Sequence, residues 1–432
     1  MRLFGRKAPV DEPVAPKPRP TLPPGPPAGD DGLRSVTDHR NYLLSLVEPL
    51  SPFGMQLLDA LDLAVCEEIS APGPLPPAST AAVVGWALRT DDLHADGVIL
   101  NLVTGLGAED ELPPGSATQV DENQLLPIGA DAVIGLGDAS VVDQGDDPEL
   151  HVHTLVRAGD GVRVAGTDVS DGQLLVQHGA VLDPRMVGLL AGVGIDKVLA
   201  RPRPRIVVIS SGRGLVEPGR DLPDHHHVHD ANGYMLAAAA RNEGCQVWRL
   251  GVVSEDPDEV REAISDQLIR ADLVISTGGF REEDGDVLSE VIPQLGAADF
   301  AEVNMVPGRH QGFALIGDDL VPMVMLPGDP VGAYVGYQNF VRPLIRKLMG
   351  IEPHVLPPVR AITRSVLRSQ PGVFEFARGT LTTDHGTSFV ELSPGRDRAH
   401  LSDLASVNAL VLLDEFTEVV SAGQQVQVWP LD

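Results

Sequence analysis

The chain has few cysteines, few aromatic residues and no long apolar run. Its two cysteines, Cys66 and Cys245, lie far apart and show no metal-site spacing. We therefore expect two reduced, buried thiols in a cytoplasmic protein. No apolar stretch reaches the ~20 residues that a helix needs to span a bilayer. The basic segment Met1–Lys7 has no apolar core behind it, so neither a transmembrane segment nor a secretory signal is expected.

Positive charge is also scarce. The 432 residues include 61 acidic side chains against 32 lysines and arginines, which gives a formal charge of −29. A field of this sign repels nucleic acid and anionic lipid, so we expect non-specific binding to neither. A small anionic ligand stays possible, because a local basic pocket can override the global field. The length allows about two to four domains.

Strands and helices alternate in the second half of the chain. The apolar runs Arg205–Ile209 and Ala271–Ile275 are typical of buried strands, whereas Asn232–Glu243, Asp256–Arg270 and Asp286–Leu295 are typical of helices. Repeated alternation of this kind predicts a mostly parallel sheet with helices on its faces. A short helix is also expected around Met186–Ala191.

Four small glycine-bearing turns accompany this pattern. They are Ser210–Gly212, Ser276–Gly279, Pro307–Gly308 and Pro327–Pro330. The first two directly follow predicted strands, and open α/β sheets bind their ligands at such strand ends. Small residues there let backbone N–H groups approach an anion closely. The turns therefore predict a binding edge.

The order of these motifs resembles the MoeA/gephyrin E-domain family, the molybdopterin molybdenumtransferases, over residues 35 to 432. The matching motifs are Gly129–Val133, Gly166–Val169, Arg203–Val208, Asp230–Asn232, Thr277–Gly279, Met305–Arg309 and Leu326–Pro330. The resemblance implies an α/β multidomain protein, preceded here by a disordered, Pro-rich tail. The expected segments are the tail over 1–34, a linking domain over 35–72 and 161–202, an inserted β-rich lobe over 73–160, a molybdopterin-binding α/β domain over 203–350 and a C-terminal β domain over 351–432.

The resemblance also implies a reaction. Family members insert molybdate into adenylylated molybdopterin with the help of magnesium, usually as homodimers. By matching motifs, the resemblance assigns catalytic roles to Asp230, Asp256 and Asp286. Binding of molybdopterin or its adenylylated form falls to Ser211, Gly212, Asn232, Thr277, Gly278, Gly279, Asp284, Pro307, Gly308, Arg309, Pro327, Gly328, Asp329 and Pro330. Metal ligands are not identified.

Several positions depart from the family pattern. Val84 occupies the place of a catalytic aspartate, and Arg213 and Gly214 replace two carboxylates. The remaining changes are Glu122-Asn123, Phe280–Glu283, Arg309-His310 and Asp329. These changes predict reduced or lost transfer activity. The alternative is a catalytically silent dimeric scaffold that binds a protein partner, for example in cell division or envelope assembly.

Two groups of charged or polar residues leave alternatives open. Arg213, Arg281, Arg309 and His310 fall on three turns of the predicted edge. They are either surface charge or a remodelled anion pocket that binds a phosphorylated ligand without magnesium. The segment His225–His229 favours a solvated loop over a metal site, because consecutive histidines on a loop do not preform a tetrahedral site.

Overall fold

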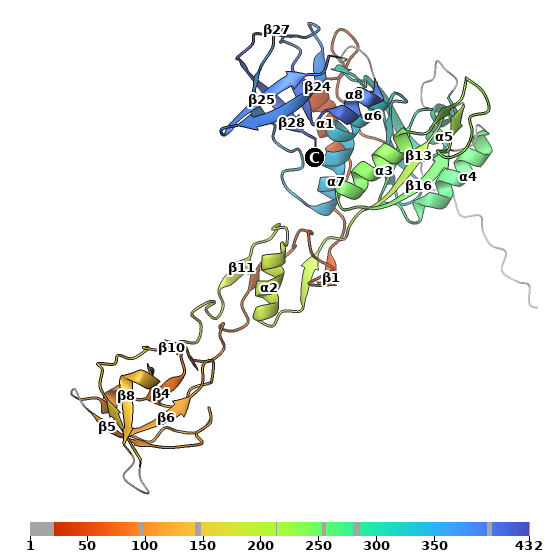
Figure 1. Ribbon diagram of the computed structural model, residues 1–432. Coiled ribbons are helices and arrows are strands. Elements are labelled where there is room, and N and C mark those ends of the chain that lie inside the picture. Colours follow the sequence, from red (N-terminus) through yellow and green to blue (C-terminus); the bar gives the residue numbers. More distant parts are fainter. Residues whose placement is uncertain are drawn as a thin grey trace, which may run out of the picture. The chain divides into compact units, whose positions relative to one another are not determined.

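The structure is a computed structural model that describes residues 21–94, 98–142, 148–212, 214–252, 256–279, 286–394 and 400–431. Contacts divide the chain into one unit of Pro52–Arg201 and another of Met1–Ser51 with Pro202–Asp432 (Figure 1). None of the helices in the described ranges has the length and apolar character that crossing a bilayer requires.

The unit Pro52–Arg201 contains a six-stranded sheet in the order β7-β4-β6-β5-β9-β8. Its strands are β4 (Gly85–Leu88), β5 (Ile99–Leu102), β6 (Ser116–Val120), β7 (Ala132–Gly135), β8 (Ala139–Val142) and β9 (Glu149–Val152), with the 3-10 helices η1 (Thr90–Asp92) and η2 (Leu136–Asp138) between them. Leu88, Leu100 and Leu150 lie at the centre of its core. The expected β-rich character of this part is confirmed.

In the described residues, the rest of that unit consists of three short antiparallel strand pairs and one helix. The pairs are β1 (Phe53–Gln56) with β12 (Lys197–Ala200), β2 (Ile69–Ser70) with β11 (Leu174–Val176), and β3 (Thr80–Ala81) with β10 (Val162–Arg163). Helix α2 (Pro184–Gly192) begins after Asp183, whose carboxylate accepts from the backbone N–H groups of Arg185 and Met186. This confirms the helix expected around Met186–Ala191.

The α/β part of the second unit has the strand order β16-β13-β17-β21-β20-β18. Its strands are β13 (Arg205–Ser210), β16 (Gln246–Val252), β17 (Leu273–Thr277), β18 (Gly296–Glu302), β20 (His310–Ile316) and β21 (Val321–Leu326). Its helices are α3 (Asn232–Asn242), α4 (Pro257–Leu268), α5 (Val287–Leu295), α6 (Pro330–Gly336), the π-helix η4 (Tyr337–Val341) and α7 (Arg342–Met349). The strands β16, β13, β17 and β21 run parallel to one another, whereas β20 pairs antiparallel with β21 and β18 pairs antiparallel with β20.

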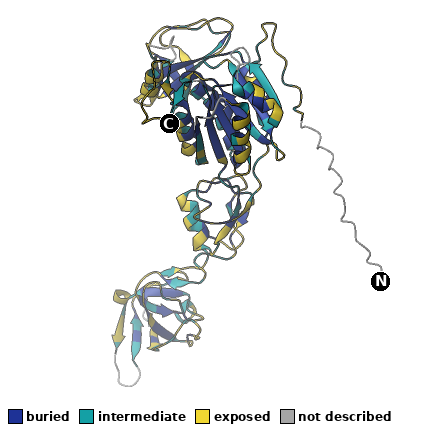
Figure 2. Ribbon diagram, turned by 90° about the vertical axis from the view of Figure 1, so that its right-hand side faces the viewer, coloured by how far each residue is buried: buried dark blue, intermediate teal, exposed yellow. Residues whose placement is uncertain are grey.

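Burial follows from this layering. Every residue of β17 is buried, and so is every residue of β13 after Arg205. Since successive side chains of a strand point to opposite faces, both faces of the sheet are covered. Helices α4 and α5 supply Val260, Ile264 and Leu288 to the core on one face, and Figure 2 shows the strands as the most buried layer. The predicted mostly parallel, covered sheet is confirmed.

Helix α1 (Val36–Ser45) packs in this second unit, against α7 and η4. The Ser35 hydroxyl caps it by accepting from the Asp38 N–H. The Lys347 ammonium donates to the Leu44 carbonyl oxygen over 2.6 Å, and the His39 ring meets Phe340 edge-on. These contacts join α1 to residues about three hundred positions away. The grouping of 35–72 with 161–202 as one linking domain stays a prediction.

The C-terminal part is a small closed barrel. Strands β24 (Phe374–Asp384), β25 (Thr387–Leu392), β22 (Val359–Thr363), β28 (Gln425–Pro430) and β26 (Ala409–Leu413) pair in that order, and β26 pairs again with β24. Further elements are β19 (Met305–Val306) at the barrel edge, the ribbon of β23 (Leu367–Arg368) with β27 (Val419–Val420), and α8 (Leu401–Ser406). The expected C-terminal β domain is thus confirmed as a barrel.

Candidate functional site

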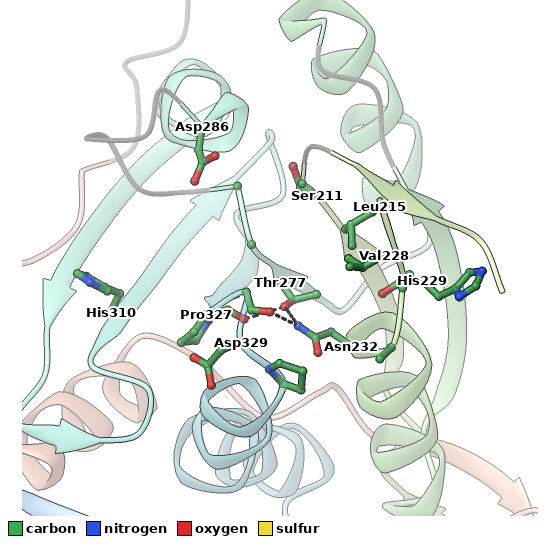
Figure 3. A pocket seen from close by; sticks show the side chains of 17 residues that line it. Ser211, Leu215, Val228, His229, Asn232, Thr277, Asp286, His310, Pro327 and Asp329 are labelled. Atoms are coloured by element: carbon green, nitrogen blue, oxygen red, sulfur yellow. Dashed lines mark hydrogen bonds between the residues drawn. The ribbon is translucent and has the colours of Figure 1, made fainter. Parts of the chain in front are cut away.

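A cavity of 630 Å³ opens at the carboxyl ends of β13, β17 and β21 (Figure 3). Strands β16 and β17 flank β13 on opposite sides, so the chain crosses from one side of β13 to the other between β16 and β17. The cavity therefore lies at a topological switch point, where open α/β sheets bind ligands. All its lining residues belong to the unit of Met1–Ser51 and Pro202–Asp432.

The turns after β13 and β17 pack directly against each other. The Ser211 N–H donates to the Thr277 carbonyl oxygen over 3.0 Å. Gly278 and Gly279 both have φ of +73°, and a Cβ on Gly278 would lie 2.3 Å from the Ser211 carbonyl oxygen. Only glycine allows this combination of backbone angle and approach, so the cavity floor depends on these two residues.

A hydrogen-bond network joins three of the predicted segments. The Asn232 side-chain amide, on the first turn of α3, donates to the Thr277 hydroxyl over 2.9 Å and to the Gly328 carbonyl oxygen over 2.8 Å (Figure 3). The Thr277 hydroxyl donates in turn to the Pro327 carbonyl oxygen over 2.8 Å. The ends of β17 and β21 are thereby fixed to the start of α3.

Asp230 is held by the protein itself. Its side chain is almost fully buried and accepts from the Ser210 hydroxyl over 2.8 Å, the Gly233 N–H over 2.9 Å and the Arg249 guanidinium over 3.1 Å. Arg249 also donates to both oxygens of Glu217 and lies over the Tyr234 ring. Hydrogen bonding to Glu217 raises the pKa of Arg249, which keeps the guanidinium charged.

The other ionisable groups of the cavity come from different sides. Asp329 caps α6 by accepting from the Gly332 N–H over 2.6 Å. Asp286 precedes α5, and the His310 Nδ1 atom contacts the Glu302 carboxylate. Within the described ranges, no three His, Cys, Asp or Glu side chains come together in an arrangement that fits a metal ion.

Most of the predicted site residues come together in this cavity. Those that line it are Ser211, Gly212, Asp230, Asn232, Thr277, Gly278, Gly279, Asp286, Pro327, Gly328, Asp329 and Pro330. Pro307, Gly308 and Arg309 do not line it. Asp256 caps α4 by accepting from the Asp258 and Glu259 N–H groups, and it does not line the cavity either. Asp284, Arg213 and Arg281 lie outside the described residues.

One wall of the cavity was not predicted. It comes from a two-stranded ribbon of β14 (Leu215–Val216) and β15 (Val228–His229), of which Leu215, Val228 and His229 line the cavity. The sequence analysis expected a solvated loop here, and two-residue strands give no usable periodicity. Two histidines of this segment contact protein groups: His227 pairs with Asp224, and the His229 Nε2 lies 2.9 Å from the Arg220 carbonyl oxygen.

Val84 lies in the other unit, directly before β4, and its side chain is 42 % exposed. Next to it, Gly85 packs so closely on β7 that a Cβ there would lie 1.8 Å from the Ile134 carbonyl oxygen. The backbone at this point is therefore tightly constrained, whereas the exposed Val84 side chain can be substituted without disturbing the packing.

Comparison with protein families matches three models in order along the chain. The MoeA N-terminal region (domain I and II) matches residues 34–194, a probable molybdopterin binding domain matches 207–347, and the MoeA C-terminal region (domain IV) matches 360–431. The second match contains the whole cavity, since its lining residues run from Ser211 to Pro330.

Individual relatives agree with these models. Molybdopterin molybdenumtransferase 1 of Mycobacterium tuberculosis is 32 % identical over 424 residues, which cover 92 % of this chain and 98 % of the relative. Molybdopterin molybdenumtransferase 2 of that organism is 30 % identical, over 92 % and 100 %. A solved molybdopterin biosynthesis MoeA protein from Pyrococcus horikoshii has a TM-score of 0.80 at 25 % identity, over 93 % and 99 %. The chain therefore belongs to the MoeA family of molybdopterin molybdenumtransferases.

Proposed function

We propose that this chain acts in molybdenum cofactor synthesis, binding molybdopterin or its adenylylated form in the cavity and transferring molybdenum from molybdate to it. The observation that carries the proposal is the cavity itself, which glycine turns form at a topological switch point inside the molybdopterin-binding segment. A volume of 630 Å³ falls in the range of pockets for small organic ligands.

The backbone supplies the groups that suit a phosphorylated ligand. The turns Ser211–Gly212 and Gly278–Gly279 line the cavity with small residues, and Asn232 opens the eleven-residue helix α3 at its rim. The N-terminus of such a helix carries positive partial charge and N–H donors that suit an anion, although in α3 the Gly233 N–H already donates to Asp230. We propose that these groups hold the phosphate, because they need no side chain to reach it.

We further propose that transfer is slower than in family members with the full set of carboxylates. Val84 and Gly214 carry no acid, and the carboxylate of Asp230 is occupied by three internal donors. A carboxylate whose oxygens already accept these hydrogen bonds has little capacity left to bind a metal ion. Asp286 lines the cavity as well, and we propose it as the catalytic carboxylate.

The proposal includes a homodimer and a cytoplasmic location. Several apolar side chains of the unit Pro52–Arg201 are exposed, as an interface would require: Val83, Val84, Leu125, Ile128 and Leu136. Both cysteines are free thiols, which suits a reducing compartment.

A second function, binding of a protein partner, is favoured by one exposed aromatic residue. Phe416 is 86 % exposed on the barrel. Its turn is fixed, because the Asp414 carboxylate accepts from the Phe416 N–H and the Thr417 hydroxyl. A rigid turn that presents a phenylalanine is a good anchor for a partner. We propose this as a scaffold role beside, or in place of, catalysis.

Reconstitution tests the first proposal. Purified protein is mixed with adenylylated molybdopterin, magnesium and molybdate, and activation of a molybdenum-free apo-enzyme is followed. Activation above a no-protein control supports transfer, and Asp286→Asn provides the matched inactive variant. No activation beside an active family member contradicts transfer. The scaffold role is then tested by comparing partner capture by the wild type and Phe416→Ala.

A further inference from the structure

Arg249 on β16 lies where two carboxylates converge beside the cavity. Its guanidinium donates to Glu217 over 2.8 and 2.5 Å and to Asp230 over 3.1 Å. It also donates to the Tyr234 hydroxyl over 3.1 Å and lies 4.0 Å above that ring. The side chains of Arg249 and Asp230 are 19 % and 1 % exposed. Such a shielded, multiply bonded cation is a fixed part of the structure.

The backbone of β16 is shaped around this cation. In the pairing with β13, Val208 faces Arg249 but the next residue, Ile209, faces Gly251, so Leu250 forms a bulge. Gly251 has φ of +85°, and a Cβ there would lie 2.8 Å from the Glu217 Oε1 atom. Bulges re-aim side chains at functional edges. Here the bulge and the glycine leave space for the Glu217 carboxylate beside Arg249.

The same contacts leave little for a divalent metal. Magnesium prefers several carboxylate or carbonyl oxygens in near-octahedral order. Asp230 uses Oδ1 for the Gly233 N–H and Oδ2 for Ser210 and Arg249, and Asp329 uses Oδ1 to cap α6. No three candidate ligands meet anywhere in the described part of the chain. The donors that the structure describes around the cavity therefore do not form the magnesium site that the family resemblance implies.

We propose that Arg249 is the resident cation of this site: it neutralises Asp230 and Glu217 in place of a divalent metal, so that the cavity binds its ligand without one. Arg249 is a positioning residue in this arrangement. Through Asp230 it fixes the end of β13 and the start of α3, and through Glu217 it fixes the β14–β15 ribbon. The ligand chemistry is a phosphorylated pterin, and this part of the inference rests on the proposed function.

Ligand binding by the wild-type chain is the first test. The full-length protein is titrated anaerobically with adenylylated molybdopterin in EDTA and again in magnesium. We expect the two dissociation constants to agree within about threefold, and a gain of more than about tenfold in magnesium, 1.4 kcal/mol, overturns the inference. No binding in either buffer contradicts the proposed function, and the second test then decides the role of Arg249 alone.

The second test uses Mn²⁺ alone as the probe, with free Mn²⁺ measured by electron paramagnetic resonance. Arg249→Met is expected to bind one Mn²⁺ more tightly than the wild type, because it frees two adjacent carboxylates. Adding Asp230→Asn is expected to remove that gain. Arg241→Met is the matched control, since among the described residues Arg241 makes one long hydrogen bond, to the Val247 carbonyl oxygen. Equal Mn²⁺ binding by Arg249→Met and Arg241→Met overturns the inference.

Arg249→Met leaves a buried carboxylate without its partner and can fail to fold. The double variant Arg249→Met/Asp230→Asn removes both charges and is then compared with Asp230→Asn alone. Under the inference neither of these two proteins binds extra Mn²⁺, and both bind the ligand equally in EDTA and in magnesium. A requirement for magnesium in either one overturns it.

Discussion

The side-chain amide of Asn232 donates a hydrogen bond of 2.9 Å to the hydroxyl of Thr277, which joins the first turn of α3 to the end of β17. The Thr277 hydroxyl has one proton, which it gives to the Pro327 carbonyl oxygen. Toward Asn232 it therefore acts only as an acceptor, and the Gly328 carbonyl oxygen also only accepts. These two contacts fix the orientation of the amide and hold three chain segments together.

Thr277→Val is expected to lower the free energy of unfolding by about 1–3 kcal/mol, because one N–H of the Asn232 amide and the Pro327 carbonyl oxygen lose the Thr277 hydroxyl as their partner in a buried place. Thr277 is 2 % exposed, so water does not replace the lost bonds. Thr277→Ser preserves the hydroxyl and is the matched control. Urea unfolding of both variants provides the comparison. A valine variant as stable as the serine variant contradicts the role given to the network.

Gly278→Ala tests the close packing of the two turns. The φ of +73° alone costs roughly 1–2 kcal/mol for alanine. The new Cβ would also meet the Ser211 carbonyl oxygen at 2.3 Å, which forces the turns apart. We expect a larger loss of stability than φ alone explains, together with loss of ligand binding in the cavity.

The control for Gly278→Ala is Gly219→Ala in the same unit. Gly219 has φ of +86°, and a Cβ there would meet no atom within 4 Å. It therefore reports the backbone cost without the clash. Thermal unfolding and ligand titration of the two variants decide the matter: equal losses of stability with unchanged ligand binding mean that the approach of the turns is not essential.

The alternation of strands and helices was enough to predict the sheet and the cavity edge. Buried parallel strands such as Leu273–Thr277 read as continuous apolar runs, and their turns follow directly in the sequence. β18 gave no such signal, because Gly296–Glu302 is half-buried throughout and mixes alanine with acidic residues. Its place at the sheet edge is set by pairing with β20, which is a tertiary property.

The sequence predicted those parts of the site that adjacent residues form, and it missed the parts that depend on residues far apart in the chain. Turns such as Thr277–Gly279 carry their own signature, so the sequence located them. Arg249 has no signature, since its partners Glu217 and Asp230 lie 32 and 19 positions away. Nothing in the local pattern shows that Asp230, predicted as catalytic, is held by three internal donors. Such pairings emerge only when β16 is placed beside β13.

His39 predicts acid sensitivity of the packing between α1 and η4. Its side chain is fully buried, and both ring nitrogens have no hydrogen-bond partner. Burial, with a smaller contribution from Arg34, lowers the pKa of His39 from 6.5 to about 4. The folded state therefore holds the neutral ring, and its stability is fully present above pH 6.5 and is lost as the pH falls toward 4.

Between about pH 7.5 and pH 5 this one residue is expected to remove about 2 kcal/mol from the free energy of unfolding. His39→Leu, which cannot be protonated, is expected to flatten that part of the pH dependence. His178→Leu, at an exposed position, is the matched control and should leave it unchanged. Urea unfolding at both pH values measures the difference, and equal slopes for the two variants contradict the prediction.

The two carboxylates that the family resemblance implies at positions 84 and 214 can be introduced separately, with different structural consequences. Val84→Asp is expected to fold as the wild type, because the side chain is 42 % exposed. It should not bring transfer activity to the level of other family members, because Gly214 still lacks an acid and Asp230 is still held by Arg249. Reconstitution with molybdate measures this, and full recovery by the single variant contradicts it.

Gly214→Glu is expected to be structurally costly instead. Gly214 has φ of +76°, and a Cβ there would lie 2.8 Å from the His226 carbonyl oxygen across the β14–β15 ribbon. Strain of this kind costs about 1–3 kcal/mol and displaces the ribbon that forms one cavity wall. Gly214→Ala carries the same Cβ without the carboxylate, so equal losses of stability and ligand affinity in the two variants assign the effect to the backbone. If Gly214→Glu is instead as stable as the wild type, the ribbon adapts to the side chain, and the fold of this chain tolerates a carboxylate at position 214.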